Sequence, residues 1–149
     1  MPSFEHTRSI TVAAPPAAVH ALIDDLHAWT KWSPWEGLDA NLERKYSGSE
    51  KGVGARYGWV GKKSGQGSMA ITRAMPDRID LDLDFVKPFK ANNKAVFRFE
   101  PEGSATRVTW TMSGTRNVLL ALMGKLFFDA MIGRDFDKGL AKLKTIAEG

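Results

Sequence analysis

Residues 117–147 form the stretch that most constrains how this chain can fold. Apolar side chains recur there mostly every three or four residues, which is the repeat of one helix face. They form two stripes that do not align: Leu119, Leu122, Met123, Leu126 and Phe127, then Phe128, Met131, Ile132, Phe136, Leu140, Leu143 and Ile146. Either the helix is apolar over most of its circumference, or it breaks between residues 124 and 129. In both cases the rest of the chain must cover it. The break is favoured, with residues 119–127 forming a short separate turn or helix over the mouth of a cavity and residues 128–146 packing on the sheet.

The chain before this stretch is predicted to form strands. The clearest is residues 78–85, where four apolar side chains alternate with Asp80, Asp82 and Asp84, so that one face is apolar and the other polar. Further strands are predicted over residues 4–13, 38–46, 55–60, 67–74, 95–99 and 105–112. After residue 38 the strands follow one another through short turns, many of them glycine-rich, with no helical pattern between them, which indicates an antiparallel meander.

Two short helices are expected between the first and second strands. Pro15 and Pro16 end the first strand, and apolar residues then recur at helical spacing at Val19, Leu22, Ile23 and Leu26. Trp29, Trp32 and Trp35 follow at a spacing of three, which suits a second short helix. These large indoles either close one end of the core, or Trp32 or Trp35 lines a ligand cavity.

The element order therefore predicts an α+β fold: a strand, two short helices, about six strands and one long helix. A sheet with one apolar face and a very apolar helix are both covered if the sheet curves around the helix, with an apolar cavity between them. At 149 residues, the chain is expected to be a single domain spanning residues 1–149.

Composition excludes several classes of site and of location. The chain contains no cysteine, so disulfides and thiolate sites are absent, and this fits a reducing compartment. The first residues lack the apolar run of a secretory signal, and the longest apolar run, residues 118–123, is far below the roughly 20 residues of a membrane span. We expect a soluble cytoplasmic protein without a membrane span. The net charge of +4 is spread along the chain, so no nucleic-acid partner is predicted.

No catalytic residue, metal site or cofactor is predicted. Asp80, Asp82 and Asp84 lie roughly 7 Å apart along one strand face, too far to share one ion readily, so we expect them to pair with cationic side chains on neighbouring strands. The histidines do not have the spacing of a zinc site; of the three, His20 is the best placed to reach the cavity. No serine lies in the context of an activated nucleophile.

Several segments resemble one protein family over nearly the whole chain. They are residues 10–19, Leu22, Asp25, Trp29, residues 32–35, 52–54, 65–67, 106–110 and 133–140, and Leu143. In this order they resemble the START-like helix-grip superfamily, and within it the polyketide cyclase/dehydrase-like branch. The resemblance implies a seven-stranded sheet that grips the C-terminal helix around an apolar cavity. Members bind lipids, sterols, hormones or polyketides, and a minority catalyse cyclisation or dehydration without one shared catalytic motif.

The candidate ligand-binding residues are large apolar side chains from the strands, the tryptophan segment and the C-terminal helix. Methionine recurs among them, and it adapts to exchangeable contacts. The set is Trp32, Trp35, Tyr57, Trp59, Met69, Ile71, Phe85, Phe97, Trp110, Met112, Met123, Phe127 and Met131. The alternative is that most of them simply fill the core. Tyr57, Arg73 and Thr111 are candidate polar contacts.

Three functions are consistent with this sequence. The first is non-catalytic binding of an apolar or aromatic small molecule, lipid- or polyketide-like, in the internal cavity. The second is a cyclase or dehydratase-like enzyme, which requires a titratable group within reach of the substrate. The third is a protein-interaction module, which requires an exposed apolar patch. The fold alone does not decide among them.

Overall fold

The structure, a computed structural model, describes residues 3–34, 42–62, 65–87, 90–115 and 125–149. The side chains of residues 3–4, 91, 115 and 125–132 lie outside this description. In chain order the elements are β1 (Ser3–Val12), α1 (Pro16–His20), the 3-10 helix η1 (Leu26–Lys31), β2 (Glu43–Gly48), β3 (Ala55–Gly61), β4 (Gly65–Met75), β5 (Arg78–Lys87), β6 (Ala91–Glu102), β7 (Ala105–Thr115) and α3 (Lys125–Glu148).

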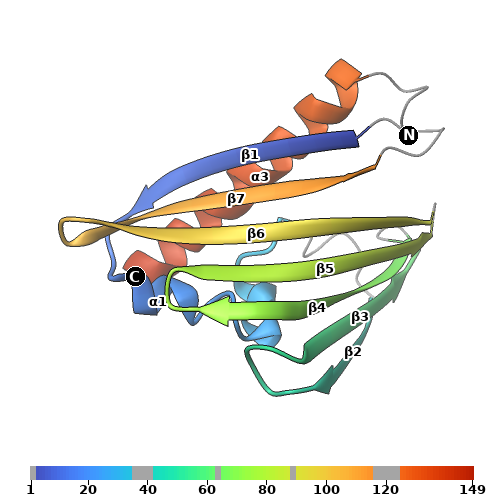
Figure 1. Cartoon of the computed structure of the whole chain (residues 1–149), viewed down its shortest axis with the longest axis horizontal. Coiled ribbons are helices and arrows are strands. Elements are labelled where there is room, and N and C mark those ends of the chain that lie inside the picture. The colour runs from blue at the N-terminus through green and yellow to red at the C-terminus, as the bar shows by residue number, and fades with distance from the viewer. Residues whose placement is uncertain (1–2, 35–41, 63–64, 88–89, 116–124) are drawn as a thin grey trace.

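The seven strands form one antiparallel sheet in the order β1-β7-β6-β5-β4-β3-β2 (Figure 1). Strands β2 to β7 form a meander, and β1 pairs with β7, so the beginning and end of the strand region lie side by side. The α+β fold class and the curved seven-stranded sheet are confirmed. Strand β6 begins at Ala91, four residues before its predicted start, because asparagine and lysine are rare in strands and concealed its beginning.

One face of the sheet, here called the inner face, packs against the helices and forms the core. In this core the ring of Trp110 on β7 stacks on Phe136 of α3, with centroids 3.9 Å apart and planes 5° apart. Trp29 and Trp32 meet Phe97 and Trp110 edge to face, at 5.8–6.4 Å. The Nε1 groups of both indoles donate to carbonyls of the preceding segment, each at 2.8 Å. Trp29 and Trp32 therefore close the core.

Helix α3 lies along the β1 side of the inner face (Figure 1). Two glycines allow close approach: a Cβ on Gly139 would lie 2.8 Å from Pro34 Cδ, and one on Gly133 would lie 2.4 Å from Arg8 Nη2. The predicted long C-terminal helix is confirmed. The predicted break is wrong over residues 125–129, because α3 continues unbroken through them and residues 125–127 belong to the same helix as Phe128. Residues 119–124 lie outside the described residues.

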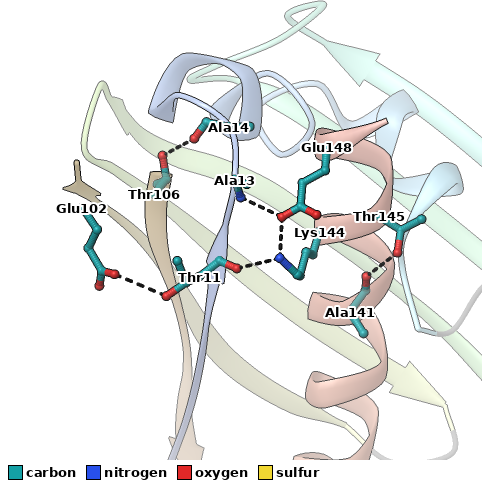
Figure 2. Close-up of polar contacts among 9 residues, drawn as sticks. All are labelled: Thr11, Ala13, Ala14, Glu102, Thr106, Ala141, Lys144, Thr145 and Glu148. Atoms are coloured by element: carbon teal, nitrogen blue, oxygen red, sulfur yellow. Dashed lines mark hydrogen bonds and ion pairs between the residues drawn. The ribbon is translucent and has the colours of Figure 1, made fainter. Parts of the chain in front are cut away.

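Polar contacts attach the C-terminal end of α3 to the end of β1 (Figure 2). Glu148 Oε2 accepts a hydrogen bond from the backbone N–H of Ala13 at 2.7 Å and also contacts Lys144 Nζ. Lys144 Nζ in turn donates to the carbonyl of Thr11 at 3.2 Å. Lys144 first, and then the Ala13 amide, lower the pKa of Glu148. The helix is thus held at both its centre and its end.

The opposite face of the sheet, here called the outer face, carries the three aspartates of β5. Asp80 accepts hydrogen bonds from Arg78 at 2.6 and 3.0 Å, and Asp82 is paired with Lys94 on β6. Asn92 Nδ2 donates to Asp84 Oδ1 at 2.7 Å. The expected pairing with cations on neighbouring strands is confirmed for Asp82. Asp80 is instead hydrogen-bonded to Arg78 of its own strand, and Arg73 on the neighbouring strand β4 lies 4.0 Å away. The hydrogen bond from Lys94 lowers the pKa of Asp82, against the opposing effect of desolvation.

Among the helices of the described residues, none has the length and hydrophobicity that a membrane crossing requires.

Phe136→Ala is expected to lower the free energy of unfolding by about 3–5 kcal/mol, because it removes a fully buried ring and leaves a cavity beside Trp110. Urea unfolding of the purified protein measures this change. Ile146→Ala, in the same helix at a position that is 41 % exposed, is the matched control and should cost at most about 1 kcal/mol. Equal losses in the two variants would contradict the packing described above.

Lys94→Met is expected to lower stability at pH 7 by roughly 0.2–1 kcal/mol, the range for exposed ion pairs, because 60 % of the Lys94 side chain is exposed. The pKa of Asp82 is depressed in the folded state. Its contribution is therefore present above the unfolded pKa of about 3.9 and is lost as the pH falls through the lower folded value.

The difference between wild type and Lys94→Met should therefore shrink as the pH falls below about 3.9, when urea unfolding is measured across the acid range. Lys87→Met removes the same charge at an exposed position at the end of β5, so it controls for the change in net charge. A difference that persists unchanged at acid pH would show that the Lys94–Asp82 pair is not its source.

Candidate functional site

The inner face of the sheet consists of two parts that differ in burial. One part, here called the closed layer, comprises two rows of directly paired residues: Ile79, Phe97 and Trp110, and beside them Ile71, Leu81, Ala95 and Met112. None of these side chains is more than 4 % exposed. The closed layer is the part of the face that meets the tryptophans and α3, so it is core.

The next row of paired residues on the inner face is here called the Tyr–Asn row. It lies beside the closed layer, on the side away from the β4–β5 turn, and crosses six strands. Cross-strand pairing aligns Tyr46, Tyr57, Met69, Leu83, Asn93 and Gly114 from β2 to β7. Met69, Leu83 and Asn93 are buried, whereas the two tyrosines are only half-buried. The row therefore changes from a buried polar end at Asn93 to a partly exposed aromatic end on β2 and β3.

Aromatic rings continue from this row along the inner face. The ring of Tyr46 stacks on His27 at 3.8 Å and lies 5.0 Å from Tyr57, and Trp59 lies 5.9 Å from both Tyr57 and Phe85. The indole of Trp59 covers Gly67 on the paired strand, where a Cβ would lie 2.7 Å from the Cζ2 atom of that ring. Tyr46, Tyr57, Trp59 and Phe85 are all half-buried and form one aromatic surface.

The predicted ligand-binding residues separate into three groups. Tyr57, Trp59, Met69 and Phe85 lie together at the Tyr–Asn row and the aromatic surface. Five others are fully packed in the core: Trp32, Ile71, Phe97, Trp110 and Met112. Trp35 and Met123 lie outside the described residues, and so do the side chains of Phe127 and Met131 in α3.

Three members of the Tyr–Asn row were missed by sequence reasoning: Tyr46, Leu83 and Asn93. Asn93 was assigned to a loop, because the strand after it was expected to begin at residue 95. The alternation that places Ala95, Phe97 and Phe99 on the inner face extends back to Asn93, and this period of two was the available signal. Tyr46 was placed on a polar edge strand, where a single aromatic residue gave no sign of its neighbours.

The polar side chains expected near the ligand lie mostly elsewhere. Arg73 Nε is 4.0 Å from Asp80 on the outer face, and Thr111 Oγ1 is 3.0 Å from Thr7 Oγ1. His20, the histidine expected to be best placed for the cavity, forms a hydrogen bond with the carbonyl of Met75 at 2.9 Å. The histidine that is buried on the inner face is His6, beside Phe136. Of the three predicted polar contacts, only Tyr57 lies with the aromatic surface.

A hollow of about 370 Å³ lies mainly on the outer face, over β2 to β5. Its lining is mostly polar: Lys45, Ser47, Arg56, Gly58, Ser68, Ala70, Thr72, Asp82 and Asp84, with atoms of Tyr57 and Met69. This hollow differs in character from the predicted apolar cavity and lies across the sheet from the aromatic surface.

The aromatic surface and the Tyr–Asn row offer two kinds of contact. Ring faces and a thioether supply apolar contact, and phenol hydroxyls and one amide supply hydrogen bonds, which is the usual composition of a small-molecule site. The Tyr–Asn row contains no carboxylate, lysine or histidine. Within the described residues, no three histidine, aspartate or glutamate side chains are grouped so that they could hold a metal ion.

Comparison with known proteins identifies the family. Over residues 3–148 the sequence matches the family described as polyketide cyclase / dehydrase and lipid transport. Among proteins of curated function, none matches the sequence.

Several solved structures share the fold over nearly the whole chain. KanY is 19 % identical, with all of both chains covered and a TM-score of 0.71. A protein from Thermobifida fusca is 22 % identical, with 96 % of this chain and 92 % of that chain covered and a TM-score of 0.69. DynU16, from the dynemicin biosynthetic locus, is 13 % identical, with 95 % of this chain and 46 % of DynU16 covered and a TM-score of 0.66.

The curved sheet around a C-terminal helix and the family match over residues 3–148 lead to one conclusion: the chain belongs to the polyketide cyclase/dehydrase and lipid transport family, a branch of the START-like helix-grip superfamily.

Proposed function

We propose that this protein binds an apolar or aromatic small molecule, lipid- or polyketide-like, on the inner face of its sheet and does not itself transform it. The ligand lies against Tyr57, Trp59, Met69 and Phe85. The observation that carries this proposal is the half-buried aromatic surface, which continues from a fully packed core on the same face.

The dimensions of sheet and helix support a ligand at this position. Seven strands spaced about 4.8 Å apart span roughly 29 Å across the sheet, whereas one helix with its side chains is about 10 Å wide. Helix α3 packs on the β1 side, so it cannot also cover the rings on β2, β3 and β5. An apolar ligand stacked on these rings would remove their exposed faces from water, and each ring contact adds about 0.5–1.5 kcal/mol.

A cyclase or dehydratase-like activity is the second candidate. The family description includes cyclases and dehydrases, and His6 is a buried titratable group on the inner face of β1. Such an enzyme would use this imidazole for acid–base work on a bound polyketide. The binding proposal ranks first because the Tyr–Asn row itself contains no carboxylate, lysine or histidine, and His27, which stacks on Tyr46, has a side chain that is 60 % exposed.

A protein-interaction role has less support within the described residues. The large exposed hydrophobic side chains, Val53, Val60, Met75, Val86 and Ile146, come from five different segments. Isolated exposed apolar residues are normal on protein surfaces, and they do not define a patch for a protein partner.

Thermal unfolding in the presence of fatty acids, sterols, flavonoids and aromatic polyketides tests the binding proposal. A compound at 100 times its dissociation constant should add about 2.7 kcal/mol to the free energy of unfolding, which raises Tm by several degrees. The second candidate predicts in addition that a polyketide substrate is consumed, and that His6→Gln abolishes this turnover. If no compound of any of these classes stabilises the protein, the binding proposal is wrong.

Trp59→Leu is expected to weaken binding of an aromatic hit about 2- to 10-fold, because it removes one ring contact. Isothermal titration measures the dissociation constant, and circular dichroism checks that the variant is folded. Val60→Leu is the matched control, since its side chain alternates to the outer face of the same strand and is exposed. Unchanged affinity in a folded Trp59→Leu variant would remove Trp59 from the site.

A further inference from the structure

We propose that Asn93 is a specificity-determining residue of this site and that its carboxamide oxygen accepts a hydrogen bond from a hydroxyl group of the ligand. The ligand class is thereby narrowed to aromatic or polycyclic molecules that carry a phenolic or alcoholic hydroxyl at one end. This inference rests on the proposed function.

The first observation is the state of the Asn93 side chain. It is 8 % exposed and belongs to the inner face, in the same alternation as Ala95 and Phe97. Its Oδ1 atom is fully buried and has no hydrogen-bond partner among the described residues. A buried acceptor without a partner is destabilising, and native proteins keep few of them. A ligand donor in contact with Oδ1 would remove this destabilisation.

The second observation is the glycine paired with Asn93 on β7. A Cβ on Gly114 would lie 2.1 Å from Oδ1 and 2.9 Å from Cγ of Asn93, so the carboxamide occupies the space that any other side chain would fill. Gly114 is not among the glycines with positive φ. Glycine at position 114 therefore leaves room for the Asn93 carboxamide because it lacks a side chain, and not because the backbone needs a special conformation.

The neighbouring asparagine in the same strand differs from Asn93, because its side-chain amide group donates to the protein itself. Asn92 points to the outer face and donates to Asp84 Oδ1 at 2.7 Å and to Asp82 Oδ1 at 3.3 Å. Asn93, one residue later, belongs to the inner face, and its Oδ1 has no hydrogen-bond partner among the described residues. The protein itself therefore supplies partners for the amide group of Asn92 but none for the carboxamide oxygen of Asn93.

The position of Asn93 in the Tyr–Asn row gives the size of the ligand. Leu83 is its direct partner on β5, and Met69 and Tyr57 follow on β4 and β3. At about 4.8 Å per strand, Met69 lies roughly 10 Å and Tyr57 roughly 14 Å from Asn93 along the row. A molecule of two or three fused or linked rings spans this distance, with its hydroxyl at Asn93 and its other end on the aromatic surface.

Two pairs of probes that differ at the hydroxyl test this inference: 2-naphthol against 2-methylnaphthalene, and 7-hydroxyflavone against flavone. Isothermal titration of the wild-type protein is expected to show tighter binding of the hydroxylated member by about 2- to 10-fold, the value of one hydrogen bond. Asn93→Leu should abolish this preference by weakening only the hydroxylated probes.

Three further variants and measurements distinguish ligand recognition from a structural role. Asn92→Leu, on the outer face, should keep the wild-type preference. Gly114→Ala displaces the carboxamide and should reduce the preference without changing residue 93. Thermal unfolding of ligand-free Asn93→Leu should show an unchanged or raised Tm, because an unpartnered polar group has been replaced by an apolar one. A large loss of Tm would instead indicate that the amide stabilises the fold.

The outcomes separate the two proposals. If both members of each pair bind equally to the wild type, or if the preference survives Asn93→Leu, the role of Asn93 is rejected and the binding function stands. If none of the four probes binds the wild type and none of the broader panel stabilises it, both proposals are rejected.

Discussion

The stacked contact between Trp110 and Phe136 is the interaction on which the rest of the structure depends. It joins β7, the strand next to the β1 edge of the sheet, to the C-terminal helix through two fully buried rings, nearly parallel and 3.9 Å apart. Gly139, less than one helical turn beyond Phe136, lets the helix backbone approach the same indole and Pro34. The helix is thereby held at one place on the inner face, and its C-terminal end is attached to β1 by Glu148 and Lys144.

The position of the helix explains why the inner face has two parts. Close to the helix, the tryptophans of the η1 segment and the strand residues of the closed layer pack into one buried core. Farther along the sheet, beyond the width of one helix, the rings of β2, β3 and β5 pack on one another and remain half-buried. The same sheet face thus contains a fully buried core and a half-buried aromatic surface, and aromatic side chains contribute to both parts.

Particular residues show how far the sequence could predict the site. Tyr57, Trp59, Met69 and Phe85 were correctly brought together as large apolar side chains of one sheet face, because alternation is a local property. Trp32, Phe97 and Trp110 have the same residue chemistry but are packed in the core. Asn93 was missed, because its low strand propensity concealed that it continues the inner-face alternation of β6.

The sequence by itself determined the order and type of the elements, the single apolar face of the sheet and the apolar character of the C-terminal helix. Each of these follows from periodicity over a few neighbouring residues. Only the tertiary structure decided which apolar side chains meet the helix, which stay half-buried, and which asparagine lies opposite a glycine. These features depend on cross-strand register and on where one helix lies across seven strands, and both are set by contacts between residues far apart in the chain.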